Sequence, residues 1–179
     1  MSNDRRVEYS RAAIKNAFLK LLSTRHYNEI TITDLCKESN VSRGTFYAQY
    51  ERLGNVLNDV LSDAFSMMSV TTVLEQCDSR KLSLCRMIRE NDKYRALFMD
   101  DDLTDYIAEQ MISYFRPSYI SSAAGNSGLS EEAAAAFLEF QVQGCYAIAR
   151  KNAGKSEEEW QEIRSHIDDW IYKGFQKHC

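Results

Sequence analysis

The stretch ITITDLCKESNVSRGTFYAQYERL, residues 30–53, decides the expected fold because it carries two helix-start signals separated by a short hinge. Thr31 and Asp34 fit the capping-box pattern, in which the two side chains bond each other's backbone N–H groups. A short helix follows, and Asn40 suits the left-handed turn that ends it. Ser42 then caps the next helix. Two short helices joined by one tight turn predict a helix-turn-helix.

An amphipathic helix is predicted on each side of this stretch. Beginning at Ser10, the expected N-cap, apolar residues recur at helical spacing over residues 10–27. The same spacing over residues 53–68 predicts a further helix, which is placed to act as a lever between the N-terminal head and the rest of the chain.

The helix predicted over residues 43–50 carries side chains suited to DNA. The N-terminal residues of a recognition helix face base edges in the major groove, and Arg43 can form a bidentate pair with guanine worth about 1–3 kcal/mol of discrimination. Phe46 is expected in the core. Hydroxyls suited to phosphate oxygens are carried by Thr45, Tyr47 and Tyr50. A tyrosine at such a position can equally be a half-buried packing residue.

Composition predicts an all-α chain. Among 179 residues there are one proline and seven glycines, so helix breakers are few. No stretch approaches the roughly 18 consecutive apolar residues of a membrane span, and the first eleven residues are polar rather than signal-like. We therefore expect a cytoplasmic protein without a membrane partner.

Charge is distributed unevenly. Residues 1–52 hold nine Lys and Arg against six Asp and Glu, a net charge of +3, whereas the whole chain has −4. The remaining residues therefore carry −7. A basic head on an acidic body fits a DNA-contacting head, because phosphate neutralisation needs local positive charge.

The sequence over residues 12–57 resembles the DNA-binding domain of TetR-family transcriptional regulators, whose pattern T(V/I)xDLxxxAxVSxGTFYxxF recurs almost intact from Thr31 to Tyr50. The resemblance implies a DNA-binding domain at residues 1–52 and a helical effector-binding and dimerisation domain at residues 53–179. It also implies a homodimeric repressor that a small-molecule effector releases from a palindromic operator in double-stranded DNA. The predicted DNA-binding residues are Thr31, Ser42, Arg43, Gly44, Thr45, Tyr47, Gln49, Tyr50 and Arg52.

Two positions depart from the family pattern. Leu53 stands where the family usually has a lysine whose charge meets the DNA backbone, and Gln49 stands where histidine is common. Arg52 is the candidate to take over the phosphate contact. Without that contact, operator affinity would be lower than is typical of the family, or the helix predicted over residues 53–68 would dock differently on DNA.

Several helices are expected in the body. They cover residues 80–91, a segment capped by Asp92, and residues 103–115, after which Pro117 ends the helix or opens a flexible linker over residues 117–130. Two longer helices follow, capped by Ser130 and Ser156.

The last two helices carry apolar seams at spacings of three and four, which suit a four-helix bundle formed by two subunits as well as an intramolecular core. The TetR resemblance favours the dimer. The predicted interface residues are Phe137, Phe140, Gln141, Gly144, Ile148, Trp160, Ile163, Ile167, Trp170 and Gly174.

An effector pocket is expected in the body, although ordinary core packing explains the same residues. The candidate lining residues are Met87, Phe98, Tyr106, Met111 and Phe115. The acidic run at residues 100–102 could bind a cation, but a solvated cluster at a helix start explains it more simply. We predict neither a metal nor a cofactor.

An enzyme is not expected, since only three histidines are present and HExxH, GxSxG and phosphate-loop motifs are absent from the sequence. The five cysteines form no CxxC pair and indicate neither a zinc ribbon nor a disulfide framework. Two alternatives to the repressor stay open: an activator on the same fold, and a helical protein-interaction adaptor that no longer binds DNA.

Overall fold

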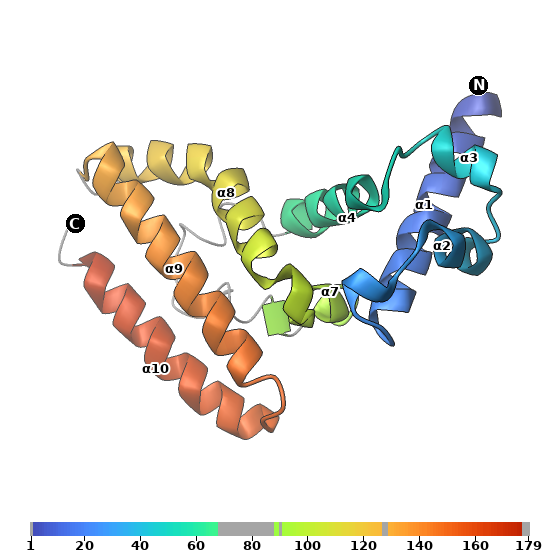
Figure 1. Cartoon of the computed structure of the whole chain (residues 1–179). Coiled ribbons are helices and arrows are strands. Elements are labelled where there is room, and N and C mark those ends of the chain that lie inside the picture. The colour runs from blue at the N-terminus through green and yellow to red at the C-terminus, as the bar shows by residue number, and fades with distance from the viewer. Residues whose placement is uncertain (1, 68–87, 90, 127–128, 177–179) are drawn as a thin grey trace. The chain divides into compact units, whose positions relative to one another are not determined.

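The computed structural model describes residues 2–67, 88–89, 91–126 and 129–176, with side chains except those of residues 2–4, 122–126 and 171–176. Every regular element in these ranges is a helix (Figure 1), which confirms the predicted all-α class. The elements are α1 (Ser2–Leu22), η1 (Tyr27–Glu29), α2 (Ile32–Ser39), α3 (Arg43–Tyr47), α4 (Leu53–Met67), α7 (Arg95–Met99), η2 (Asp101–Leu103), α8 (Thr104–Asn126), α9 (Glu131–Lys151) and α10 (Glu157–Gln176). Among the described helices, none combines the length and apolar character that a membrane crossing requires.

The chain divides into two compact units. The first comprises Met1–Ser66 and Ala96–Thr104, and the second comprises Met67–Arg95 and Asp105–Cys179. The first unit is larger than the head expected at residues 1–52, because it includes α4 and a short segment that returns from much later in the sequence.

The helix-turn-helix forms as the sequence predicts. The Thr31 hydroxyl accepts a hydrogen bond from the Asp34 N–H at 3.2 Å, and the Asp34 carboxylate accepts from the Thr31 N–H at 3.0 Å. Asn40 adopts the left-handed conformation with φ 54°, and Ser42 caps α3 by accepting from the Thr45 N–H. These local bonds satisfy N–H groups that lack partners at a helix start.

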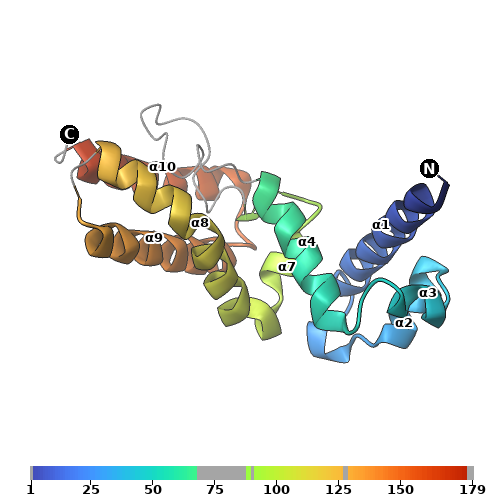
Figure 2. The ribbon, with the colours of Figure 1, turned by 90° about the horizontal axis from the view of Figure 1, so that it is seen from above.

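The head is built around the aromatic and aliphatic faces of α1 to α4. Phe46 of α3 is fully buried, as expected, and Phe18 and Leu35 bring the apolar faces of α1 and α2 to the same core. Each such side chain contributes about 1.5–3 kcal/mol on burial. Figures 1 and 2 show the short helices α2 and α3 beside the longer α1.

Helix α1 begins at Ser2 rather than after Ser10, so the expected N-cap is wrong. The Ser10 hydroxyl donates to the backbone carbonyl of Arg6 at 2.8 Å and also lies 3.0 Å from that of Val7. Serine inside a helix can satisfy its hydroxyl with a carbonyl one turn back instead of capping. The helix therefore gains two turns on the N-terminal side.

Helix α8 continues through Pro117 to Asn126, so the linker predicted over residues 117–130 is wrong for residues 117–126. A proline inside a helix removes one N–H bond and costs roughly 3 kcal/mol. Tyr119, buried almost completely just beyond it, packs the continued helix into the second unit. Tertiary burial thus outweighs the local cost.

Helix α7 begins at Arg95 rather than directly after Asp92, whose expected cap is therefore misplaced. Residues 92–94 form a turn in which the Tyr94 N–H donates to the Asn91 carbonyl. Of the helix predicted over residues 80–91, the structure describes only Ile88 and Arg89, which are helical and buried, and Asn91, which is not helical.

The two long helices of the second unit are confirmed. The Ser130 hydroxyl caps α9, and Ser156 forms a reciprocal capping pair with Glu159 at the start of α10. Figure 1 shows α9 and α10 running side by side in opposite directions. Because a short turn joins them, antiparallel packing is the expected arrangement.

The carboxylate of Asp59 on α4 joins three segments of the head. It lies 2.8 Å from the Arg11 guanidinium and 3.8 Å from the Lys15 ammonium, both on α1, and accepts a hydrogen bond from the Tyr50 hydroxyl at 2.5 Å. Lys15 also pairs with Asp63 one turn further along α4. These contacts attach α4 to the helix-turn-helix.

The ionisation of this cluster follows from its contacts. Burial, the largest single influence, would raise the pKa of Asp59, but the bonds from Tyr50 and Arg11 and the Lys15 charge outweigh it, so the pKa is lowered. Burial, followed by the bond to Asp59, raises the pKa of Tyr50 to about 12. The folded state therefore favours a carboxylate and a neutral phenol.

Tyr50→Phe should lower the free energy of unfolding at pH 7 by about 1–3 kcal/mol, since a bond to a charged group is lost. The loss should shrink as the pH rises from 10 towards 12. A phenol whose pKa is higher in the folded state stabilises the fold below its unfolded pKa, and that contribution disappears as the pH passes the folded pKa of about 12. Urea unfolding at pH 7, 10 and 11.5 measures the difference.

Tyr47→Phe, which alters an exposed phenol three residues earlier in the chain, is the matched control and should change stability little. An unchanged deficit of Tyr50→Phe from pH 7 to 11.5 would contradict the proposed coupling between the phenol and Asp59.

Candidate nucleic-acid interface

The first turn of α3 presents a row of exposed residues, Ser42 to Thr45. The Ser42 hydroxyl lies 2.9 Å from that of Thr45 and also caps the helix. The Arg43 guanidinium donates to the Thr33 hydroxyl at 2.6 Å, which uses one of its five N–H donors. The structure thus brings together the predicted base reader and its small polar neighbours on one exposed turn.

Gly44 lies in the middle of this turn without an intramolecular reason to be glycine. Its φ is not positive, and a Cβ built there would meet only the Ser42 hydroxyl oxygen, at the ordinary contact distance of 3.9 Å. Alanine would be favoured in a helix by about 1 kcal/mol. The absence of a side chain at Gly44 therefore leaves room on the protein surface and not in the core.

Helix α3 ends at Tyr47 rather than at residue 50 as predicted, and the contact candidates at and after its end separate into two groups. Tyr47 is 56% exposed, whereas Tyr50 is 4% exposed and directs its hydroxyl to Asp59. This placement corrects the expected phosphate contact of Tyr50, because its hydroxyl is used inside the head. The Gln49 side-chain amide hydrogen-bonds the Ser10 hydroxyl and so links the end of α3 to α1.

Thr31 is exposed, but its hydroxyl is engaged in the cap of α2. It donates to the Asp34 carboxylate at 2.6 Å while accepting from the backbone, and Arg25 lies 3.3 Å from the same carboxylate. The bond from the Thr31 hydroxyl, followed by that from its N–H, lowers the pKa of Asp34. Thr31 therefore positions α2.

Arg52 is exposed immediately before α4, where its N–H donates to the Asn55 side-chain carbonyl at 3.2 Å. Leu53, the residue that replaces the expected lysine, is the first residue of α4 and is half-buried. The guanidinium of Arg52 is consequently the cation that the sequence supplies at this helix start.

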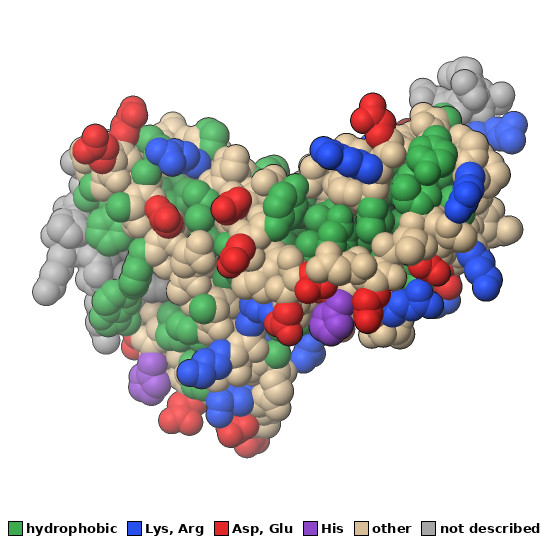
Figure 3. Space-filling model, in the orientation of Figure 1, with side chains coloured by type: hydrophobic (Ala, Val, Ile, Leu, Met, Phe, Trp, Pro, Cys, Tyr) green, Lys and Arg blue, Asp and Glu red, His purple; other side chains and the backbone are tan. Residues whose placement is uncertain are grey.

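An apolar groove lies between α9 and α10, and six of the predicted interface residues line it. These are Phe140, Gln141, Gly144, Ile148, Ile167 and Trp170. The rings of Phe140 and Trp170 lie 6.0 Å apart, although Trp170 is 65% exposed. Figure 3 shows hydrophobic side chains on the surface formed by these two helices.

The remaining interface candidates lie elsewhere. Phe137 is partly exposed and Ile163 is half-buried, while Gly174 lies in α10 among residues whose side-chain surroundings are not described. Trp160 is fully buried, and its ring lies 4.9 Å from the guanidinium carbon of Arg89. This corrects its assignment to an intersubunit seam, because its face of α10 packs within the subunit.

Two residues of the groove lack an intramolecular explanation. A Cβ at Gly144 would meet nothing within 4 Å. Gln141 is buried, and its side-chain carbonyl oxygen has no hydrogen-bond partner among the described residues. Such an unsatisfied buried group costs about 1–3 kcal/mol.

The candidate pocket residues fall in both units. Phe98 belongs to the first unit, whereas Tyr106, Met111 and Phe115 belong to the second. Phe98, Met111 and Phe115 are fully or almost fully buried as ordinary core residues, and Tyr106 is half-buried. Met87 lies outside the described residues.

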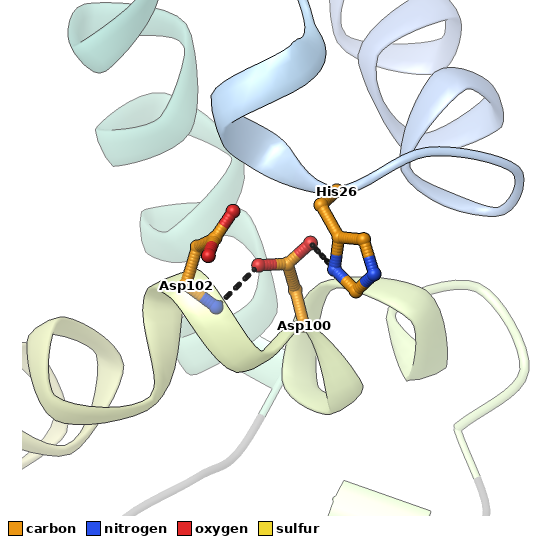
Figure 4. Close-up of side chains that lie close together, drawn as sticks. All are labelled: His26, Asp100 and Asp102. Atoms are coloured by element: carbon orange, nitrogen blue, oxygen red, sulfur yellow. Dashed lines mark hydrogen bonds and ion pairs between the residues drawn. The ribbon is translucent and has the colours of Figure 1, made fainter.

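The acidic run at residues 100–102 matches the predicted solvated cluster at a helix start for Asp101 and Asp102, which are exposed, but not for Asp100. Asp100 is buried and accepts hydrogen bonds from the Tyr27 N–H at 2.9 Å and the Asp102 N–H at 3.0 Å, with His26 Nδ1 3.7 Å away (Figure 4). Asp102 accepts from the Asn28 N–H at 3.3 Å. Both carboxylates thus cap η1, the turn between α1 and α2.

Groups of His26, Asp100 and Asp102 that could ligate a metal lie within 4.8 Å of one another. Their carboxylates already accept backbone bonds, so the arrangement is explained by capping. Sequence reasoning missed this cap and the Asp59 cluster, because both depend on contacts between residues far apart in the chain.

The chain is similar to a helix-turn-helix regulator over part of its length. An uncharacterized HTH-type transcriptional regulator, YxbF of Bacillus subtilis strain 168, is 39% identical to it over 59 residues. The match covers 32% of this chain and 16% of the length of that protein. No family model and no solved structure matches the chain.

Thr31→Ala should raise the pKa of Asp34 towards its ordinary value, because the hydroxyl bond that contributes most to the lowering is removed. Carboxyl NMR titration measures the change. Thr33→Ala is the control, because it removes a hydroxyl that bonds Arg43 instead, and it should leave the pKa of Asp34 unchanged. An unchanged Asp34 pKa in Thr31→Ala would refute the assigned capping box.

Proposed function

We propose that this protein is a sequence-specific DNA-binding transcriptional regulator whose DNA-binding domain is residues 1–52. The observation that carries the proposal is the exposed first turn of α3, held by its own cap on a buried Phe46, within a correctly formed helix-turn-helix. The partial similarity to an HTH-type transcriptional regulator supports the same function.

Arg43 is the proposed base reader. In the free protein its guanidinium is held by the Thr33 hydroxyl at 2.6 Å, which limits its freedom before it pairs with the O6 and N7 atoms of a guanine. Ser42, Thr45 and Tyr47 supply exposed hydroxyls for phosphate oxygens. Arg52 supplies a charge at the start of α4, where the helix dipole also favours an anion.

Gly44 is proposed to allow the backbone of α3 to approach the duplex closely. A side chain at this position would meet only Ser42 within the protein, so the space it leaves is available to a DNA backbone or base edge.

Gly44→Ala should leave thermal stability unchanged or raise it slightly, while weakening binding to the selected operator tenfold or more. The added methyl fits the protein but occupies the proposed approach space. The operator is obtained by selection from a randomised duplex pool, and affinity is measured by fluorescence anisotropy at fixed salt.

Gly154→Ala in the second unit is the matched control, since a Cβ there meets nothing within 4 Å and the methyl should likewise fit the protein. Unimpaired DNA binding by Gly44→Ala would count against a close approach at this turn. Failure of the wild-type protein to enrich any sequence, even at low salt, would favour the adaptor alternative.

We further propose that the protein is a homodimer, in which the α9–α10 groove packs against the same groove of a second subunit. An exposed Trp170, a small Gly144 and a buried unsatisfied Gln141 carbonyl all suit an isologous helix interface. A two-fold dimer reads two half-sites about 34–36 Å apart, which requires a palindromic operator.

Trp170→Glu should convert the dimer to a monomer in sedimentation-velocity experiments, because it places a charge in the apolar groove. The monomer should retain the helical circular-dichroism signal, since Trp170 is mostly exposed within the chain. Tyr114→Glu, at another exposed aromatic, is the control and should leave the dimer intact. A wild-type protein that sediments as a single chain at micromolar concentration would overturn the dimer.

The TetR-like part of the proposal is a repressor that a small-molecule effector releases from DNA, with the effector bound within residues 53–179. Its physical support is the attachment of α4 to α1 and Tyr50 through Asp59, which makes the head and α4 move together. An effector that shifts α4 would then change the half-site spacing. An activator on the same fold is the alternative, distinguished by whether transcription from the selected operator rises or falls when the protein is added.

A further inference from the structure

The first two turns of α1, residues 2–9, extend the head beyond its core. The described side chains of residues 5–9 are all exposed, and Tyr9 is 79% exposed. These turns bury little apolar surface, so they add little to the stability of the fold. Arg5 and Arg6 lie at the N-terminal end of the helix, where positive charge opposes the helix dipole and is unfavourable.

Four of the nine cations in residues 1–52 form ion pairs with described residues. The structure pairs Arg11 with Asp59, Lys15 with Asp63, Lys20 with Glu38 and Arg25 with Asp34. Arg5 and Arg6, by contrast, form no ion pair with any residue that the structure describes. Their charge is available to a partner, and Figure 3 shows Lys and Arg side chains over this end of the head.

The position of Arg6 relative to α3 follows from Ser10. Residues four apart lie on the same side of a helix, about 6 Å apart along its axis. The Ser10 hydroxyl bonds the Gln49 side chain at the end of α3, and the neighbouring Arg11 lies over the Tyr50 ring at 5.4 Å. Arg6 is therefore one turn beyond the contact between α1 and α3, on the same side of α1.

We infer that the first two turns of α1 form a second DNA-contacting element, in which Arg6 and Arg5 bind phosphates adjacent to the half-site read by α3. The inference rests on the proposed DNA-binding function. The partner is the DNA backbone because exposed guanidinium groups without an ion pair among the described residues complement phosphates, and the surface is continuous with the proposed interface. Tyr9 shares the Arg5 side of the helix and offers an exposed hydroxyl to the same backbone.

The test measures affinity for the selected operator from 50 to 200 mM salt with wild type, Arg6→Ala, Arg6→Lys and Lys20→Ala. Loss of one phosphate contact per subunit of a dimer reduces the slope of log affinity against log salt by about 1.8. The ratio of wild-type affinity to Arg6→Ala affinity should therefore fall roughly tenfold between 50 and 200 mM salt. Arg6→Lys should retain most of the slope, and Lys20→Ala, which removes an exposed but paired cation, should match wild type.

The outcomes separate the inference from the function on which it rests. An unchanged salt slope in Arg6→Ala, together with impaired binding by Gly44→Ala, would overturn the α1 contact and leave the proposed function in place. A wild type that enriches no sequence would overturn both. Relaxed base preference in Arg6→Ala would overturn the phosphate assignment, because phosphate contacts weaken binding evenly across sequences. Neutral methylphosphonate substitutions should weaken wild type at phosphates where they leave Arg6→Ala unaffected.

Discussion

The head depends on one carboxylate, that of Asp59. Arg11 and Lys15 of α1 and Tyr50, which follows α3, all contact this carboxylate. A residue of α4 therefore holds together the elements that position α3. Its own burial is unfavourable, but the converging donors outweigh that cost and keep it ionised. Because α1 and the segment after α3 both meet α4 through this carboxylate, α4 cannot shift relative to them without breaking charged hydrogen bonds.

Two glycines show the difference between space needed by the fold and space left for a partner. Neither Gly44 nor Gly144 adopts a conformation that requires glycine, and a Cβ at either would meet little or nothing. One lies on the exposed turn of α3 and the other in the groove between α9 and α10. Since alanine would stabilise each helix, the cost of glycine at these positions is consistent with partners approaching from outside.

The cation pairs divide the basic residues of the head by role. Arg11 and Lys15 serve the attachment of α4, and Arg25 supports the cap of α2 through Asp34. Four of the nine cations in residues 1–52 are thus engaged within the head, and the positive charge open to a nucleic acid comes from those without an ion pair among the described residues. Charge counted from a sequence measures composition, whereas availability depends on what lies opposite each side chain.

By itself the sequence determined the all-α class, the helix-turn-helix and the caps at Thr31, Ser42, Ser130 and Ser156, because each depends on residues within one helical turn of one another. It also identified the exposed turn that contains Arg43. Only the tertiary structure decided that Tyr50 faces Asp59, that Trp160 packs within the subunit, that α8 passes through Pro117 and that Asp100 caps η1. Periodicity assigns a side chain to one face of a helix, but what covers that face depends on segments distant in sequence, whose packing can outweigh a local preference.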